Sequence, residues 1–341
     1  MYLLSCTPSG RDIILPHMSQ SERPILIVDA MNLFVRSYSA YPTMSTHGYQ
    51  MGGTIGFLKT LRRITNECAP TNIYIAWEGG GSQKRRALYS EYKLGRKPEK
   101  LNRFYGDDIP DSEENRKHQI ISLLSMLKCA PVCQLYLSDC EGDDIVAYLT
   151  RGPLKDKPKI IVSADKDMYQ LLGEKTSIYS LHKKKVLNVS DILEEFHVHP
   201  HNFGLAKALC GDPSDNIPGI KGVGWKTAAK LLPILCSEDD LILDDLFAYC
   251  HSHVAESSLY KRIIDNEDTV RLNWRLVYLD GSMLSHHQSA QIDGLLDTFS
   301  PAVNRMGLIK QLIKEGVGDF DVSQFMMSFS CIDNFNNARI E

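Results

Sequence analysis

Residues 24–29 read PILIVD, an unbroken apolar run that ends in an aspartate. An apolar run without alternation is typical of a strand that is buried on both faces, as in a parallel sheet. Similar runs occur at residues 72–77 (NIYIAW), 131–137 (PVCQLYL) and 159–162 (KIIV). Helical patterns separate them, at residues 54–66, 113–127 and 143–150. The alternation predicts an α/β fold whose parallel sheet has helices on both faces.

The second half of the chain has a different pattern. After a polar, hairpin-like stretch at residues 176–188, the sequence becomes mostly helical from about residue 199. We therefore predict an α/β core over residues 21–199 and a helical region over residues 200–331. Residues 1–20 and 332–341 are predicted to be flexible tails.

Composition excludes several classes of protein. Among 341 residues, 43% are hydrophobic and 23% charged, which is typical of a globular protein rather than a disordered or fibrous one. No run reaches the roughly 20 apolar residues of a membrane-spanning helix. The first 20 residues lack the pattern of a secretory signal, and nine scattered cysteines include no CxxC pair, which argues against a zinc site or a disulfide framework. We expect a cytoplasmic protein without membrane association.

Acidic residues cluster where the predicted strands end. The carboxyl ends of parallel strands meet at one edge of the sheet, where ligands bind. Crowded carboxylates need cations, and Mg²⁺ prefers oxygen ligands. Two such ions can activate water and stabilise the leaving oxygen in phosphodiester hydrolysis, which is the predicted reaction. Taken alone, each acid is more often a helix cap or a turn former. The set is Asp29, Glu78, Glu141, Asp143, Asp144, Asp165, Asp167, Asp212 and Asp215.

Two other segments suggest a polyanionic ligand. Residues 84–103 contain eight basic and two acidic residues, although the chain as a whole has a net charge of −4. Residues 211–232 (GDPSDNIPGIKGVGWKTAAKLL) combine a glycine-rich turn with a lysine-bearing helix, a suitable cradle for phosphate. The turn's carbonyls could also hold a monovalent cation such as K⁺. The plainer alternatives are a solvated basic helix and an ordinary connection between helices. The candidate phosphate contacts of residues 211–232 are Gly219, Gly222, Gly224, Lys226, Thr227 and Lys230.

The glycine-rich segment resembles the helix-hairpin-helix signature of the structure-specific 5′-nucleases. This family includes flap endonucleases, phage 5′-exonucleases and the 5′-nuclease domain of bacterial DNA polymerase I. The resemblance extends over roughly residues 24–282, through IVDAMN, EGDDIVA, SADKDMYQLL and GDPSDNIPG. It implies a PIN-like 5′-nuclease fold with a helical arch at about residues 82–118. Within the family, the chain looks closest to stand-alone phage replication nucleases such as the T-even phage ribonuclease H.

The resemblance also implies roles for the acids. One metal ion would be held mainly by Asp29, Glu78, Glu141, Asp144 and Asp165. A second ion would be held by Asp167, Asp212 and Asp215, with Asp165 shared, while Asp143 supports the cluster. The family normally has aspartate where Glu78 stands, and the extra methylene moves the carboxylate. We still expect activity, with the metal bound through a water or with an altered preference for Mn²⁺.

The arch is identified by SQKRRALYSEYKLGRKP, which is similar to the family's SxxRxxLYPEYKxxR. By this resemblance Lys93 and Arg96 contact the scissile phosphate and act in catalysis with Asp29 and Asp165. Tyr92 would stack on a base, and Arg85 would guide the strand.

The sequence thus predicts a Mg²⁺-dependent 5′→3′ exonuclease and flap endonuclease with a two-metal mechanism. It would act as a monomer on 5′ flaps, 5′ ends and RNA–DNA duplexes, removing RNA primers in replication and repair. A single-strand-binding protein or a sliding clamp would be its protein partner. Two alternatives are a catalytically impaired scaffold that binds branched DNA and a single-strand ribonuclease of the related PIN type, which lacks the hairpin signature.

Overall fold

The computed structural model describes residues 23–81, 83–95 and 113–333. Six strands form one sheet in the order β3-β2-β1-β4-β5-β6. The first five in sequence are parallel, and β6 pairs antiparallel with β5. All four predicted strands are present, and the polar stretch at residues 176–188 is the β5–β6 hairpin. The bounds are β1 (Ile25–Asp29), β2 (Ile73–Trp77), β3 (Cys133–Tyr136), β4 (Lys159–Ser163), β5 (Thr176–Ser180) and β6 (Lys185–Leu187).

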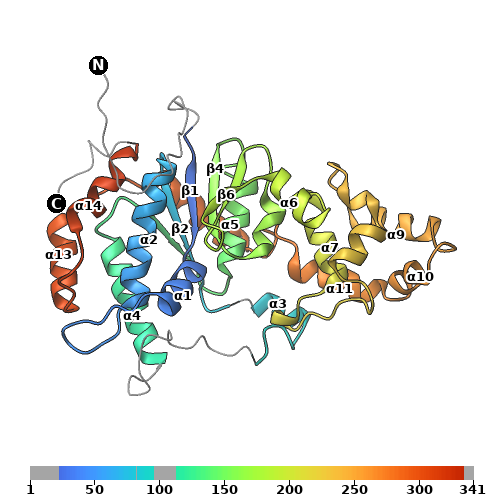
Figure 1. The fold of residues 1–341 in the computed structure, drawn as a ribbon, viewed down its shortest axis with the longest axis horizontal. Helices are drawn as coiled ribbons and strands as arrows, with labels where there is room; N and C mark the ends of the chain where they lie inside the picture. Colours follow the sequence, from blue (N-terminus) through green and yellow to red (C-terminus); the bar gives the residue numbers. More distant parts are fainter. Residues whose placement is uncertain (1–22, 82, 96–112, 334–341) are drawn as a thin grey trace.

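Helices cover both faces of this sheet, as predicted (Figure 1). On β1, Leu26 and Val28 face one apolar core and Ile25 and Ile27 face the other, because side chains alternate along a strand. The first core is completed by α1 (Ala30–Ala40), α2 (Gly52–Cys68) and α4 (Glu113–Leu127), and the second by α5 (Gly142–Arg151) and α12 (His286–Thr298). The helix α1 was not predicted, because its pattern follows β1 without a break.

The helical region has a third apolar core of its own. It lies at the opposite end of the molecule from α13 (Figure 1). The short helix α3 (Gln83–Leu88) packs against its α11. The larger helices of this region are α7 (Phe203–Cys210), α8 (Trp225–Leu231), α9 (Leu243–Ser252), α10 (Ser258–Asp265) and α11 (Glu267–Val277), preceded by α6 (Val189–Phe196).

The last helices return to the α/β part. Figure 1 shows α13 (Arg305–Lys314) and α14 (Val322–Met327) beside α2 and α4. Phe325 and Phe329 are fully buried in the first core. These helices therefore complete the sheet's own core, although the sequence placed them with the helical region.

The predicted C-terminal tail begins too early. Ile332 is buried, and the Asp333 carboxylate pairs with the Arg23 guanidinium at 2.7 Å. Arg23 also donates a hydrogen bond to the carbonyl of Cys331 at 2.7 Å. The tail is polar overall, so its sequence did not indicate that Ile332 is buried or that Asp333 forms an ion pair. The other predicted tail residues, 1–20 and 334–341, lie outside the described residues. Within the described ranges, no helix combines the length and the hydropathy that a membrane crossing needs.

Candidate active site

A cavity of about 800 Å³ lies at the carboxyl ends of the parallel strands, between the sheet and the helical region. Its acidic lining comes from strand ends, from α5 and from the loop after α7, as the strand topology predicts. Eight of the nine predicted carboxylates line it: Asp29, Glu78, Glu141, Asp143, Asp165, Asp167, Asp212 and Asp215. The structure therefore brings these eight predicted side chains together in one cavity.

At least three of these acids, Asp29, Asp165 and Asp212, also cap helical turns. Asp29 ends β1 and accepts a hydrogen bond from the backbone N–H of Asn32 at 3.1 Å. The Ser163 hydroxyl donates to the other oxygen of Asp29 at 3.0 Å. Asp165 follows β4 and accepts from the backbone N–H of Asp167 at 2.9 Å. Capping and cavity lining are thus not alternatives here, since the same hydrogen bonds fix these carboxylates at the cavity edge.

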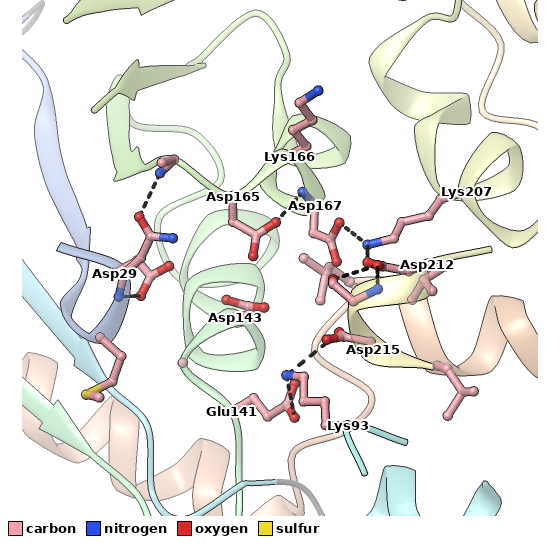
Figure 2. A pocket seen from close by; sticks show the side chains of 18 of the residues that line it. Asp29, Lys93, Glu141, Asp143, Asp165, Lys166, Asp167, Lys207, Asp212 and Asp215 are labelled. Carbon is pink, nitrogen blue, oxygen red and sulfur yellow. Dashed lines mark hydrogen bonds and ion pairs between the residues drawn. The ribbon is translucent and has the colours of Figure 1, made fainter. Parts of the chain in front are cut away.

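Crowding makes the ionised acids unfavourable. Burial, with smaller contributions from Asp165 and Glu78, raises the pKa of Asp29 to about 6. Burial, Asp29 and Asp165 raise the pKa of Asp143 well above its ordinary value. Figure 2 shows Asp143 between Asp165 and Glu141, at the centre of the cluster. Such a cluster favours bound cations.

The predicted roles of Asp144 and Arg85 are wrong. Arg85 is 1% exposed and holds Asp144 with two hydrogen bonds of 2.7 and 2.8 Å. The same guanidinium contacts Glu141 at 3.3 Å and donates to the carbonyl of Leu276 at 2.9 Å. Successive residues on a helix point about 100° apart, so Asp143 faces the cavity and Asp144 faces Arg85. A buried Arg85 does not guide a DNA strand, and Asp144 is its ion-pair partner rather than a cavity ligand.

Of the residues predicted to form the arch, one is buried and another reaches the cavity. Tyr92 is buried, and its hydroxyl donates to Glu141 at 3.1 Å, so the predicted stacking on a base does not fit its position. Lys93 does reach the cavity, with its Nζ 3.0 Å from Glu141 and 4.0 Å from Asp215. Burial alone would raise the pKa of Glu141, but Lys93 and Arg85 hold it below its ordinary value. Arg96 lies outside the described residues.

A second lysine in the cavity escaped prediction. Lys207 is buried on α7, and its ammonium pairs with Asp167 and, at 2.8 Å, with Asp212. Burial would lower the pKa of Lys207, but these two carboxylates raise it above its ordinary value. Burial raises the pKa of Asp167 to about 6 despite this partner. The available signal was one charged residue in the otherwise apolar sequence FGLAKALC of α7.

The two lysines act as the cations of the cluster. Figure 2 shows Lys207 reaching Asp167 and Asp212, and Lys93 between Glu141 and Asp215. In the described part of the chain, no three acidic, histidine or cysteine side chains stand ready as a metal cage. The donor chemistry nevertheless fits hard divalent ions, because the cavity offers carboxylate oxygens from several elements.

The glycines of the hairpin differ in whether and why the structure needs a residue without a side chain. A Cβ on Gly219 would lie 2.0 Å from the carbonyl oxygen of Cys210, and Gly222 has a φ of +87°. Gly224 has open space around its Cα. Lys226 and Lys230 are exposed on α8, with Thr227 half-buried beside them. The predicted DNA-contacting face is therefore accessible, while Gly219 serves packing.

This difference predicts the effect of adding one methyl group. Gly219→Ala should lower the free energy of unfolding by about 1–3 kcal/mol, because two backbone segments must separate. Gly224→Ala is the matched control and should change it by less than about 0.5 kcal/mol. Urea unfolding of both variants provides the measurement. Equal losses in the free energy of unfolding would show that the close contact with the carbonyl of Cys210 does not cause the destabilisation.

Relatives of the chain include proteins that are named as nucleases. Flap endonuclease Xni of Shewanella sp. strain MR-4 is 30% identical over 255 residues, which is 74% of this chain and 89% of the relative. The 5′-3′ exonuclease of Aquifex aeolicus is 29% identical over 222 residues, 64% of this chain and 72% of the relative. DNA polymerase I of Thermus thermophilus matches at 29% identity, but over 25% of its own length. The chain is a nuclease.

Family models identify the family itself. The 5′-3′ exonuclease N-terminal resolvase-like domain matches residues 24–197, and the 5′-3′ exonuclease C-terminal SAM fold matches residues 198–293. The chain therefore belongs to the 5′-3′ exonuclease family.

The fold agrees with this family. A crystal structure of T5 D15 protein with metal ions superposes with a TM-score of 0.62 at 18% identity, over 82% of this chain and all of that one. Human GEN1 in complex with Holliday junction DNA gives 0.56 at 12% identity, over 92% and 72% of the two chains. The finer likeness to T-even phage ribonuclease H stays a prediction.

Proposed function

We propose that this nuclease is a divalent-metal-dependent 5′→3′ exonuclease and flap endonuclease that cuts DNA near the base of 5′ flaps. The observation that carries the proposal is the cavity that is lined by eight carboxylates and by the two lysines that pair with them, Lys93 and Lys207. Neither a binding scaffold nor a structural domain has a reason to bury so many acids beside a polyanionic ligand. The names of the relatives support the same activity.

The residues of the cavity fall into two groups that would each hold Mg²⁺. One group is Asp29, Glu78, Glu141, Asp143 and Asp165, and the other is Asp167, Asp212 and Asp215, with Asp165 next to both. This assignment replaces Asp144 with Asp143 in the first group. When bound, such ions supply activation of water and neutralisation of the leaving oxygen. The metal ions would then take over carboxylates that pair with Lys93 and Lys207. The two ammonium groups would become available to phosphate.

The nucleic acid would be held through its backbone. Lys221, Lys226 and Lys230 are exposed on the hairpin and on α8, where they would contact phosphates of the duplex without reading its sequence. A structural neighbour, T5 D15 flap endonuclease, is described as a pseudo-enzyme-product complex with DNA and metal ions. The same contacts suit an RNA–DNA duplex, which makes RNA primers a further proposed substrate.

Cleavage of a 5′-labelled flap tests the proposal. Wild type and Asp165→Asn are compared in Mg²⁺, Mn²⁺ and EDTA, with an RNA-containing 5′ strand as a second substrate. We expect cutting near the junction that needs the metal and Asp165. Tight flap binding without cutting in either metal would support the scaffold alternative, with Glu78 as the first suspect. Cutting of unpaired RNA in preference to flaps would support the single-strand ribonuclease.

A further inference from the structure

The turn that carries Lys93 is fastened to the loop that carries Asp215. The backbone N–H of Lys93 donates to the carbonyl of Asp215 at 3.0 Å. In the other direction, the side-chain amide of Asn216 donates to the carbonyl of Glu91 at 3.0 Å and to that of Leu94 at 2.6 Å. These three hydrogen bonds enclose Lys93 from both sides along the chain.

The backbone of the turn needs this support. Lys93 has a φ of +55° and Asn216 a φ of +60°, both in the left-handed region. Asparagine adopts that region readily, whereas lysine does so where its surroundings impose it. With this backbone, Lys93 places its Nζ 3.0 Å from Glu141 inside the cavity. The amide of Asn216 thus holds the turn from which Lys93 reaches the acids.

The same loop also leads into the hairpin. Asn216 is three residues before Gly219, and the backbone groups of Ile217 and Asp212 pair in both directions at 2.8 and 2.9 Å. The loop is therefore one rigid unit that joins Asp212 and Asp215, the start of the hairpin and, through Asn216, the base of the arch.

We infer that Asn216 is a positioning residue, which couples the hairpin to the placement of Lys93 over the reacting phosphate. It acts through Lys93, because its side-chain amide donates to the carbonyls of Glu91 and Leu94 and not to the carboxylate cluster. The inference rests on the proposed function, since it matters for catalysis where Lys93 contacts the scissile phosphate. Lys93 would then keep a fixed position relative to the duplex that the hairpin binds.

Two substitutions remove the amide without disturbing the backbone. Asn216→Asp keeps the shape and tolerates a positive φ, but its carboxylate cannot donate to the two carbonyls. Asn216→Gly also accepts that φ and adds no charge, so agreement between the two excludes a purely electrostatic effect on DNA. Asn266→Asp is the matched control, because Asn266 donates to one carbonyl, that of Arg262, at 2.8 Å on the exposed surface of the helical region.

The measurements are single-turnover cleavage of the flap substrate in Mg²⁺, the Kd for flap DNA in EDTA, and the unfolding midpoint. Both Asn216 variants should cut about tenfold more slowly, with Kd within twofold of wild type. Asn266→Asp should match wild type in all three. On a Lys93→Ala background, the Asn216 substitutions should cost less than about twofold more, because their effect passes through Lys93.

Other results overturn the inference. An equal loss on both backgrounds would show that Asn216 supports the fold or the metal loop rather than Lys93. A weaker Kd with an unchanged rate would make it a DNA contact. If Lys93→Ala itself cuts at the wild-type rate, the coupling has no catalytic role, whereas the nuclease activity is tested separately by Asp165→Asn.

Discussion

Arg85→Ala should lower the free energy of unfolding by about 3–5 kcal/mol, the loss typical of removing one partner from a buried ion pair. The guanidinium is 1% exposed and lies against Asp144 at 2.7 Å and Glu141 at 3.3 Å, whose side chains are also buried. Without it, two buried carboxylates lose their counterion, and the carbonyl of Leu276 loses a donor. The urea midpoint should fall with an unchanged m-value.

Arg86→Ala is the control for this change. Arg86 lies next in sequence on the same helix but is exposed, so its loss should cost less than about 0.5 kcal/mol. The double variant Arg85→Ala with Asp144→Asn should lose less stability than the two single changes added together, because each removes the same pair. Strict additivity would mean that the pair contributes nothing beyond its separate members.

Asp143→Asn should reduce cleavage about 10²–10³-fold, the size expected for removing one preorganised charge from an active site. The same substitution should raise the unfolding midpoint in EDTA. Burial and the neighbouring carboxylates Asp29 and Asp165 raise the pKa of Asp143. Its ionised form therefore costs stability above the unfolded pKa, and asparagine removes that cost.

Asp144→Asn supplies the comparison. It should lower the midpoint, because it weakens the contact with Arg85, while the folded protein keeps cleavage within about tenfold of wild type. Cleavage assays and unfolding curves on the two variants, at neutral pH with and without Mg²⁺, distinguish the two acids. Equal losses of cleavage would restore the role that the sequence resemblance gave to Asp144.

The sequence predicts the sheet and the position of the cavity well because both follow from local patterns. Continuous apolar runs such as residues 24–28 mark strands buried on two faces, and an acid directly after a strand must lie at the sheet's carboxyl edge. Helix α4 occupies the predicted residues 113–127. These features need no knowledge of which residues meet over long distances.

The remaining features depend on such long-range contacts. Arg85 was grouped with an exposed basic run because its partner Asp144 comes 59 residues later. Asp143 and Asp144 are adjacent and chemically identical, so only the packing of α5 decides which one faces the cavity. Lys207 stands alone in an apolar helix, and its acids lie on two other segments.

Because α13 and α14 pack against the sheet, the part of the chain that forms the cavity ends earlier than the part that forms the sheet's core. Every described carboxylate of the cavity lies before residue 216, and the matched family models end at residue 293. Leu308, Phe325 and Phe329, however, belong to the same apolar core as β1 and α2. A chain shortened at residue 293 would keep every described residue that lines the cavity, yet it would expose this apolar surface, which favours aggregation. The residues that line the cavity therefore span a shorter part of the chain than the residues that complete its apolar core.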